Sequence, residues 1–181
     1  MRLFLFFITL ALTTLSCQKE QHFDPFIVDK SLPFQDSIKL LSKQSELKLF
    51  NTEIPESRTR TAFIVQTAYY SKGAFFFDDY KCKTAYQKDT LNIRLNNNNG
   101  YFGNGILIKV FNNQFYIKDI DPKTLKGEEK YIKTRVVSQK LILNNSRFKK
   151  NDSIYGFVDY KCSIDSLVQK HFKGYFKTII Q

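Results

Sequence analysis

The stretch "TLNIRLN" at residues 90–96 alternates apolar and polar side chains along its whole length. Successive side chains of a β-strand point to opposite faces of a sheet. Leu91, Ile93 and Leu95 are therefore predicted to face a hydrophobic core, and the residues between them to face solvent. A strand of this kind needs neighbours that repeat its period of two.

The chain supplies such neighbours on both sides. They are "AFIVQTAYY" and "AFFFDDYKC" before it, and "GILIKVF", "QFYIKDI", "YIKTRVV", "KLILN", "SIYGFVDYKCSI" and "HFKGYFKTII" after it. Gly73 and the pair Asn112-Asn113 mark hairpin turns, because glycine and asparagine tolerate the left-handed backbone of a tight turn. With no βαβ rhythm, the predicted fold is all-β: an antiparallel β-sandwich of about eight strands, with a small closed β-barrel as the alternative.

The segment "LILNNSRFKKNDSIYGFVDYK" is similar to a pattern in immunoglobulin-like bacterial surface domains, where a Lys-Asn-Asp turn precedes a strand. That resemblance implies an immunoglobulin-like form of the sandwich. One short N-terminal helix is predicted within "DSIKLLSKQSELKLF", residues 36–50, because Ile38 and Leu41 lie at helical spacing. The aromatic runs "AFFF" and "YFG" are expected in the core rather than in an aromatic binding patch.

The 181 residues suit one domain, and a chain of this length buries enough surface to fold without a metal or many disulfides. The formal net charge is +11, from 28 Lys and Arg against 17 Asp and Glu. Such a charge is compatible with an anionic partner. The basic residues are spread singly along the chain, however, which favours a solvated lysine-rich surface and gives no indication of nucleic-acid binding.

The N-terminus has the pattern of an export signal. A short basic start, "MR", precedes the thirteen residues "LFLFFITLALTTL", which are too few to span a bilayer as a helix. Ser16 and Cys17 follow, with Thr14 upstream. This arrangement resembles the signal peptide of Gram-negative bacterial lipoproteins, in which a small residue precedes an invariant cysteine and Leu is preferred at the position of Thr14.

The resemblance implies cleavage before Cys17, a diacylglycerol on its thiol and an acyl chain, such as palmitate, on its new amino group. Acyl chains of this kind anchor a protein stably in a membrane. Gln18 follows the cysteine, where an Asp would resemble an inner-membrane retention signal, so the outer membrane is the expected location. The predicted organisation is a signal peptide at 1–16, a lipid-anchored tether at 17–35 and a single β-rich domain at 36–181.

The four residues "DYKC" occur twice and end at Cys82 and Cys162. The period of two places both cysteines on inward faces, which argues against reactive thiols, because these need exposure and nearby positive charge. In an oxidising compartment a Cys82–Cys162 disulfide is expected, and two buried unpaired thiols are the alternative. The two histidines, His22 and His171, lack the spacing of metal ligands, so neither a metal nor a cofactor is predicted.

The sequence Asp-Ser or Asp-Thr followed by an apolar residue occurs four times. It resembles the acceptor of a general O-glycosylation system for exported proteins in some Gram-negative bacteria. The acceptor hydroxyls would belong to Ser37, Thr90, Ser153 and Ser166. The alternative is ordinary turn chemistry, in which Asp ends a turn and Ser or Thr begins the next element.

No catalytic constellation can be assembled from the sequence. Asp78, Asp79 and Asp121 are candidate acid–base groups, and His171 is a candidate partner of Asp159 or Asp165, but no nucleophile can be placed beside them. We therefore expect a membrane-anchored lipoprotein with a non-enzymatic binding or structural role in the cell envelope. It would act as an accessory subunit or an immunity-type protein with an envelope protein or polymer as partner. The alternatives are an envelope-polymer hydrolase and a carrier of small apolar ligands.

Overall fold

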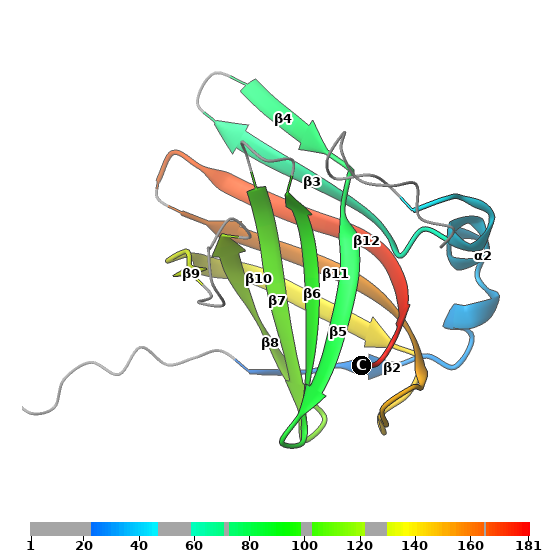
Figure 1. The fold of residues 1–181 in the computed structure, drawn as a ribbon. Coiled ribbons are helices and arrows are strands. Elements are labelled where there is room, and N and C mark those ends of the chain that lie inside the picture. Colours follow the sequence, from blue (N-terminus) through cyan, green and yellow to red (C-terminus); the bar gives the residue numbers. More distant parts are fainter. Residues whose placement is uncertain (1–22, 47–58, 71–72, 99–102, 122–129, 165) are drawn as a thin grey trace, which may run out of the picture.

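A computed structural model describes residues 23–46, 59–70, 73–98, 103–121, 130–164 and 166–181 (Figure 1). Two sheets lie face to face, and one short α-helix lies beside them. The predicted all-β sandwich is therefore confirmed. Each sheet is open and ends in terminal strands, so the described strands do not form the closed β-barrel that was the alternative.

The first sheet is built mainly from four consecutive strands in the order β8-β7-β6-β5, with β1 and β9 both pairing with β8. Its strands are β1 (Asp24–Pro25), β5 (Lys81–Gln87), β6 (Thr90–Asn98), β7 (Gly103–Phe111), β8 (Gln114–Asp121) and β9 (Lys130–Tyr131). Two-residue turns with positive φ at both positions, Lys88-Asp89 and Asn112-Asn113, join β5 to β6 and β7 to β8. The asparagine turn confirms the hairpin predicted there.

The second sheet has the order β2-β10-β11-β12-β3-β4. Its strands are β2 (Ile27–Val28), β3 (Ala62–Tyr70), β4 (Gly73–Phe77), β10 (Arg135–Leu143), β11 (Ser153–Ser163) and β12 (Gln169–Ile179). All neighbours are antiparallel except β2 and β10, which are parallel. Neither this order nor the run of four consecutive strands in the first sheet matches the ABED and CFG sheets of immunoglobulin domains, so the immunoglobulin-like connectivity is not observed.

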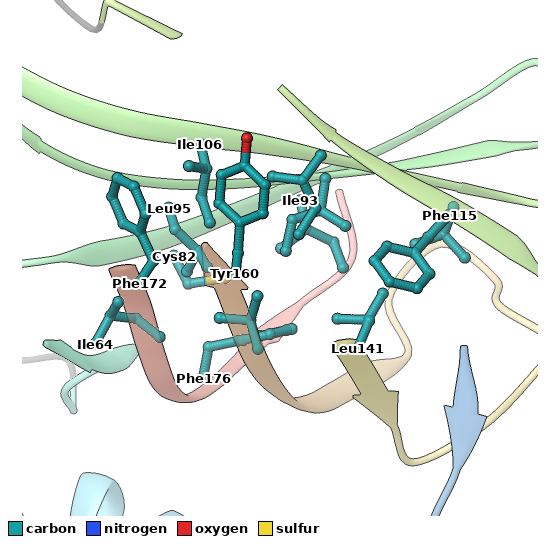
Figure 2. Packing of buried hydrophobic residues seen from close by; sticks show 14 of the residues in the cluster. Ile64, Cys82, Ile93, Leu95, Ile106, Phe115, Leu141, Tyr160, Phe172 and Phe176 are labelled. Carbon is teal, nitrogen blue, oxygen red and sulfur yellow. The ribbon is translucent and has the colours of Figure 1, made fainter. Parts of the chain in front are cut away.

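The core fills the space between the sheets (Figure 2). Leu91, Ile93 and Leu95 are fully buried, as their alternation predicts. Opposite them, the second sheet contributes aromatic side chains, among them Phe172 and Phe176. At about 25 cal/mol for each Å² of apolar surface removed from water, this interior is the main source of stability.

The segment assigned to a tether is partly folded. Phe26 is buried in the core, and Leu32, in the 3₁₀-helix η1 (Leu32–Phe34), is buried as well. The α-helix α2 (Asp36–Lys43) then buries Ile38 and ends at Lys43, so it is shorter than the predicted stretch. Residues 23–35, the end of the segment predicted as a tether, thus pack against the sandwich.

Candidate functional site

The two "DYKC" cysteines lie on inward faces, as predicted, but both are buried free thiols, so the expected Cys82–Cys162 disulfide is not formed. Strand register gives the reason. Cys162 pairs with Lys170, which pairs with Ala68 of β3, whereas the Cys82 amide donates to Thr61 Oγ1 (3.0 Å), just before β3. Thr61 and Ala68 are seven positions apart along the chain, which is about 23 Å in an extended strand, but a disulfide needs Cα atoms within about 7 Å.

Cys162 instead belongs to a polar cluster centred on the fully buried side chain of Asp119 on β8. The Asp119 Oδ2 atom accepts hydrogen bonds from the Tyr160 hydroxyl (2.8 Å), the Thr134 hydroxyl (3.2 Å) and the Cys162 thiol (3.4 Å). These donors come from β11 and from the segment before β10, so the carboxylate joins the two sheets. A buried charge is tolerated only when such partners replace its hydration.

The cation of the cluster is Lys170 on β12, whose side chain is also buried. Its Nζ atom lies 3.8 Å from Asp119 Oδ1 and donates to Asn104 Oδ1 (3.2 Å) on β7. The pair therefore connects β8 and β7 of one sheet with β12 of the other. The Asp119 cluster comprises Asn104, Asp119, Thr134, Tyr160, Cys162 and Lys170.

The raised pKa values of the Cys162 and Tyr160 side chains in this cluster fit a structural role. Burial, followed by the nearby Asp119 charge, raises the pKa of the Cys162 thiol to about 12. The same two causes raise the pKa of Tyr160, and burial raises the pKa of Cys82. Both thiols are protonated at neutral pH, and a protonated thiol is a poor nucleophile.

The sequence prediction did not single out Asp119 or Lys170. The signal was present, because each occupies an inward position in an alternating strand: Asp119 follows Phe115 and Ile117 at spacings of two, and Lys170 precedes Phe172. A charged residue at such a position predicts a buried partner of opposite sign. Only the strand pairing, however, identifies the two residues as partners.

The structure brings His171 and Asp159 together on the outward face of the second sheet. His171 Nε2 lies 2.8 Å from Asp159 Oδ1, and Lys173 Nζ lies 3.6 Å from Asp159 Oδ2. The His171 and Asp159 side chains retain 22% and 27% of their exposure. Asp79 does not join them, because it accepts a hydrogen bond from Asn97 Nδ2 (2.9 Å). This arrangement is a surface ion pair on an open sheet.

Several exposed aromatic side chains lie together on the β3–β4 hairpin. Phe75 and Phe76 retain 61% and 71% of their exposure, so the core position predicted for "AFFF" is wrong for these two residues. Phe63, Tyr69 and Tyr70 on β3 are also exposed. β4 is the terminal strand of its sheet in the described part of the chain, and we call these five residues the aromatic edge.

Two hollows lie near the β5–β6 and β7–β8 turns and share Phe111. The first, of about 290 Å³, is lined by Phe26, Tyr86, Asp89, Val110, Phe111, Asn112, Asn113, Ser146, Arg147 and Phe148. The second, of about 440 Å³, is lined by Phe23, Gln87, Lys88, Thr90, Asn92, Lys109, Phe111 and Tyr116. Both hollows are lined by several aromatic rings. The charged residues of the first are Arg147 and Asp89, whereas those of the second are the cations Lys88 and Lys109. We call the second one the basic hollow.

The O-glycosylation candidates all lie where elements begin or turn. Ser37, Ser153 and Ser166 are exposed, and Thr90 is half-buried at the start of β6, beside the basic hollow. Asp152 Oδ2 accepts a hydrogen bond from the Lys149 amide (2.9 Å), which is the turn chemistry given as the alternative. Both interpretations stay open at the other three positions.

Cys17 and His22 lie outside the described residues, as does Asp165. Within the part of the chain that the structure covers, no helix is long and apolar enough to cross a membrane, and no group of three or more His, Cys, Asp or Glu side chains could hold a metal ion. No protein-family model matches the chain, and no curated protein or solved structure is significantly similar to it.

Proposed function

We propose that this protein is a cell-envelope lipoprotein, anchored to the outer membrane through Cys17, whose β-sandwich is a non-enzymatic binding module. Its partner would be an envelope protein, for which it serves as an accessory subunit or an immunity-type inhibitor. The observation that carries the binding role is the aromatic edge, with Phe75 and Phe76 mostly exposed on a terminal strand.

An exposed edge of this kind is costly unless a partner covers it. Terminal strands are normally blunted by charge, because their free backbone groups pair readily with other chains. β4 instead carries Phe75, Phe76 and Phe77, with no charged residue among them. Large aromatic side chains are also the residues that contribute most to protein interfaces. An added partner strand would use both the backbone edge and these rings.

The packing of Phe23 limits how far an anchor at Cys17 could hold the sandwich from the membrane. Phe23 packs edge to face against Phe111 and Tyr116, and it lies six positions after Cys17. Six extended residues reach about 20 Å at most. An acylated Cys17 would therefore hold the sandwich next to the bilayer rather than on a long stalk.

The alternatives receive less support from the side-chain contacts. For a hydrolase, the His171–Asp159 pair is the best general base, but its surroundings are the flat outward face of a sheet. For a carrier of apolar ligands, the space between the sheets is occupied by fully buried side chains such as Phe172, Phe176 and Tyr160 (Figure 2). A binding surface outside the core fits the structure better.

The experiment places a photo-crosslinking amino acid at Phe76 in the full-length precursor and irradiates intact cells. The control carries the same amino acid at Leu40, an exposed apolar residue of α2. We expect one protein adduct from position 76 only, and its loss when Phe75→Ser is added. Equal adducts from both positions, or an adduct that survives Phe75→Ser, would contradict binding at the aromatic edge.

The anchor is tested separately by metabolic labelling with an alkyne-bearing palmitate. We expect labelling of the wild-type protein, and neither labelling nor maturation in the Cys17→Ala variant. An unlabelled wild-type protein in the envelope fraction would refute the lipoprotein assignment.

A further inference from the structure

The outward face of the first sheet carries several cations. Among the described side chains at outward positions of β5 to β8, cations occur and carboxylates do not. The cations that retain exposure are Lys83, Arg94, Lys109 and Lys118, whereas Lys81, at an outward position too, is buried. Strand pairing assembles them, since residues 83, 94, 107 and 118 form one row across the sheet and residues 109 and 116 pair in the next.

Aromatic rings border these cations. Phe23, Phe111 and Tyr116 pack edge to face, with centroid distances of 5.4–6.1 Å, beside the basic hollow. Lys118 Nζ lies 5.4 Å from the centre of the Tyr116 ring and 4.7 Å from that of Tyr131. We call the outward face of β5–β8 with these rings the basic face. Cations beside tyrosines suit the headgroup layer of a membrane, where amphipathic rings are enriched.

The anchor would emerge at this same face. Phe23 lines the basic hollow together with Lys88 and Lys109, and Cys17 is six residues upstream. A lipid attached to Cys17 therefore places the bilayer within about 20 Å of the hollow. The short connection from Phe23 to Cys17 thus keeps the basic hollow close to an anchored bilayer.

The other sheet provides the contrast. Its outward face also carries lysines, at positions 140, 161 and 173, but these surround Asp159, which is hydrogen-bonded to His171 and forms an ion pair with Lys173. Strand β4 lies at the far end of the molecule from the β5–β6 and β7–β8 turns (Figure 1). A sandwich with its basic face on the bilayer leaves β4 accessible to a partner.

We propose that the basic face binds the phosphates of anionic lipid headgroups and so holds the sandwich flat against the membrane. This inference rests on the proposed acylation of Cys17 for its geometry, but the headgroup contact itself needs no acyl chain. Each Lys or Arg near an anionic membrane surface adds favourable energy that salt screens within a Debye length. A lipid chain and a basic patch together are the two signals that give stable attachment.

The first test uses the unacylated chain from Gln18 to Gln181, which contains every described residue. Its binding is measured by co-sedimentation with phosphatidylglycerol-containing vesicles and with pure phosphatidylcholine vesicles. We expect binding to the anionic vesicles only, weakened by added salt. Failure to bind the anionic vesicles, or equal binding to both, overturns the proposal. Saturable binding of inorganic phosphate without vesicle binding would assign the face to a free anion and also overturns it.

Two variants with the same change of charge locate the contact. The triple variant Lys83→Gln, Lys109→Gln, Lys118→Gln is expected to weaken partitioning onto anionic vesicles at least about tenfold. The control, with the lysines at 140, 161 and 173 of the second sheet changed to Gln, is expected to stay within about threefold of wild type. Equal losses would mean that net charge, and no particular face, drives binding.

The second test uses the acylated protein in the same vesicles and maps lysine reactivity towards an amine-modifying reagent. Lys109 and Lys118 should be protected relative to the vesicle-free protein, while Lys140 and Lys173 keep their reactivity. If Cys17 is acylated and Lys109 and Lys118 stay fully reactive, the orientation is wrong although the lipoprotein assignment stands. If Cys17 is never acylated, the vesicle test with the unacylated chain still decides the headgroup contact.

Discussion

Replacement of Lys170 by methionine tests the role of the Asp119 cluster most directly. Methionine keeps most of the apolar stem of lysine and removes the cation 3.8 Å from Asp119 Oδ1. At that distance and an effective dielectric constant of about 20, the lost attraction is about 4 kcal/mol. Asn104 Oδ1 loses its donor as well. Breaking a buried ion pair by removing one partner typically costs about 3–5 kcal/mol, and we expect the free energy of unfolding to fall by that amount.

A double-mutant cycle separates the ion pair from simple loss of packing. Asp119→Asn keeps the size of the side chain and an oxygen acceptor for Tyr160, but it removes the charge that Lys170→Met leaves uncompensated. We therefore expect the double variant to be more stable than Lys170→Met alone by about 1–3 kcal/mol, although it carries one more substitution. Additive losses from the two single changes would show that the two charges are not coupled.

The assay is urea unfolding of the chain from Gln18, followed by circular dichroism, with the free energy taken from the midpoint and slope of the transition. An unchanged slope is required, because a changed slope would mean that the variant alters the unfolded or native ensemble. A loss below about 1 kcal/mol for Lys170→Met would refute the reasoning, since that is the value of an exposed ion pair.

Three further predictions follow from the same contacts. A Cβ on Gly156 would overlap the ring of Phe176, so Gly156→Ala should lower the free energy of unfolding by about 2 kcal/mol or more, and Phe176→Leu should recover part of it. Cys162 should resist iodoacetamide until the protein unfolds. Because its pKa rises from 9.0 to about 12 on folding, the unfolded thiol loses its proton first, and Cys162 alone should lower the free energy of unfolding by about 1.4 kcal/mol per pH unit between these values. The fall measured in Cys162→Ala should be less steep by about that amount. Asp159→Asn, which breaks the partly exposed pair with His171, should cost less than about 1 kcal/mol, and a larger loss in urea unfolding would contradict a surface role.

The faces of the strands could be predicted from the sequence because period two is a local property. Leu91, Ile93 and Leu95 are inward for the same reason that Cys82 and Cys162 are inward. The Asn112-Asn113 turn follows from local chemistry too, whereas the turn at Lys88-Asp89 was not predicted. The sandwich then follows from apolar faces that must cover each other.

Position along a strand and neighbours across a sheet are not local properties, and there the prediction failed. The inward direction of Cys82 and Cys162 is consistent with a disulfide, but the register places them at different levels of β3. Likewise, "AFFF" has the composition of a core strand, and only its place at the end of a sheet leaves Phe76 exposed. The face to which a strand residue points can be predicted from residues two positions away. Whether its side chain is buried depends on segments that are distant in the sequence and pack against it.

The same distinction explains why the lysines had to be reinterpreted. Along the sequence, residues 83, 109 and 118 are single cations among polar and apolar neighbours, which is the pattern of a solvated surface. Antiparallel pairing of β5 to β8 collects them on one face, and the carboxylate Asp119 of the same sheet is turned inward, where it binds Lys170. The inward turn of Asp119 thus stabilises the interior and leaves the outward face more positive. The alternation in "QFYIKDI" therefore points Asp119 inward to the buried ion pair and Lys118 outward to the face that we propose contacts anionic lipid.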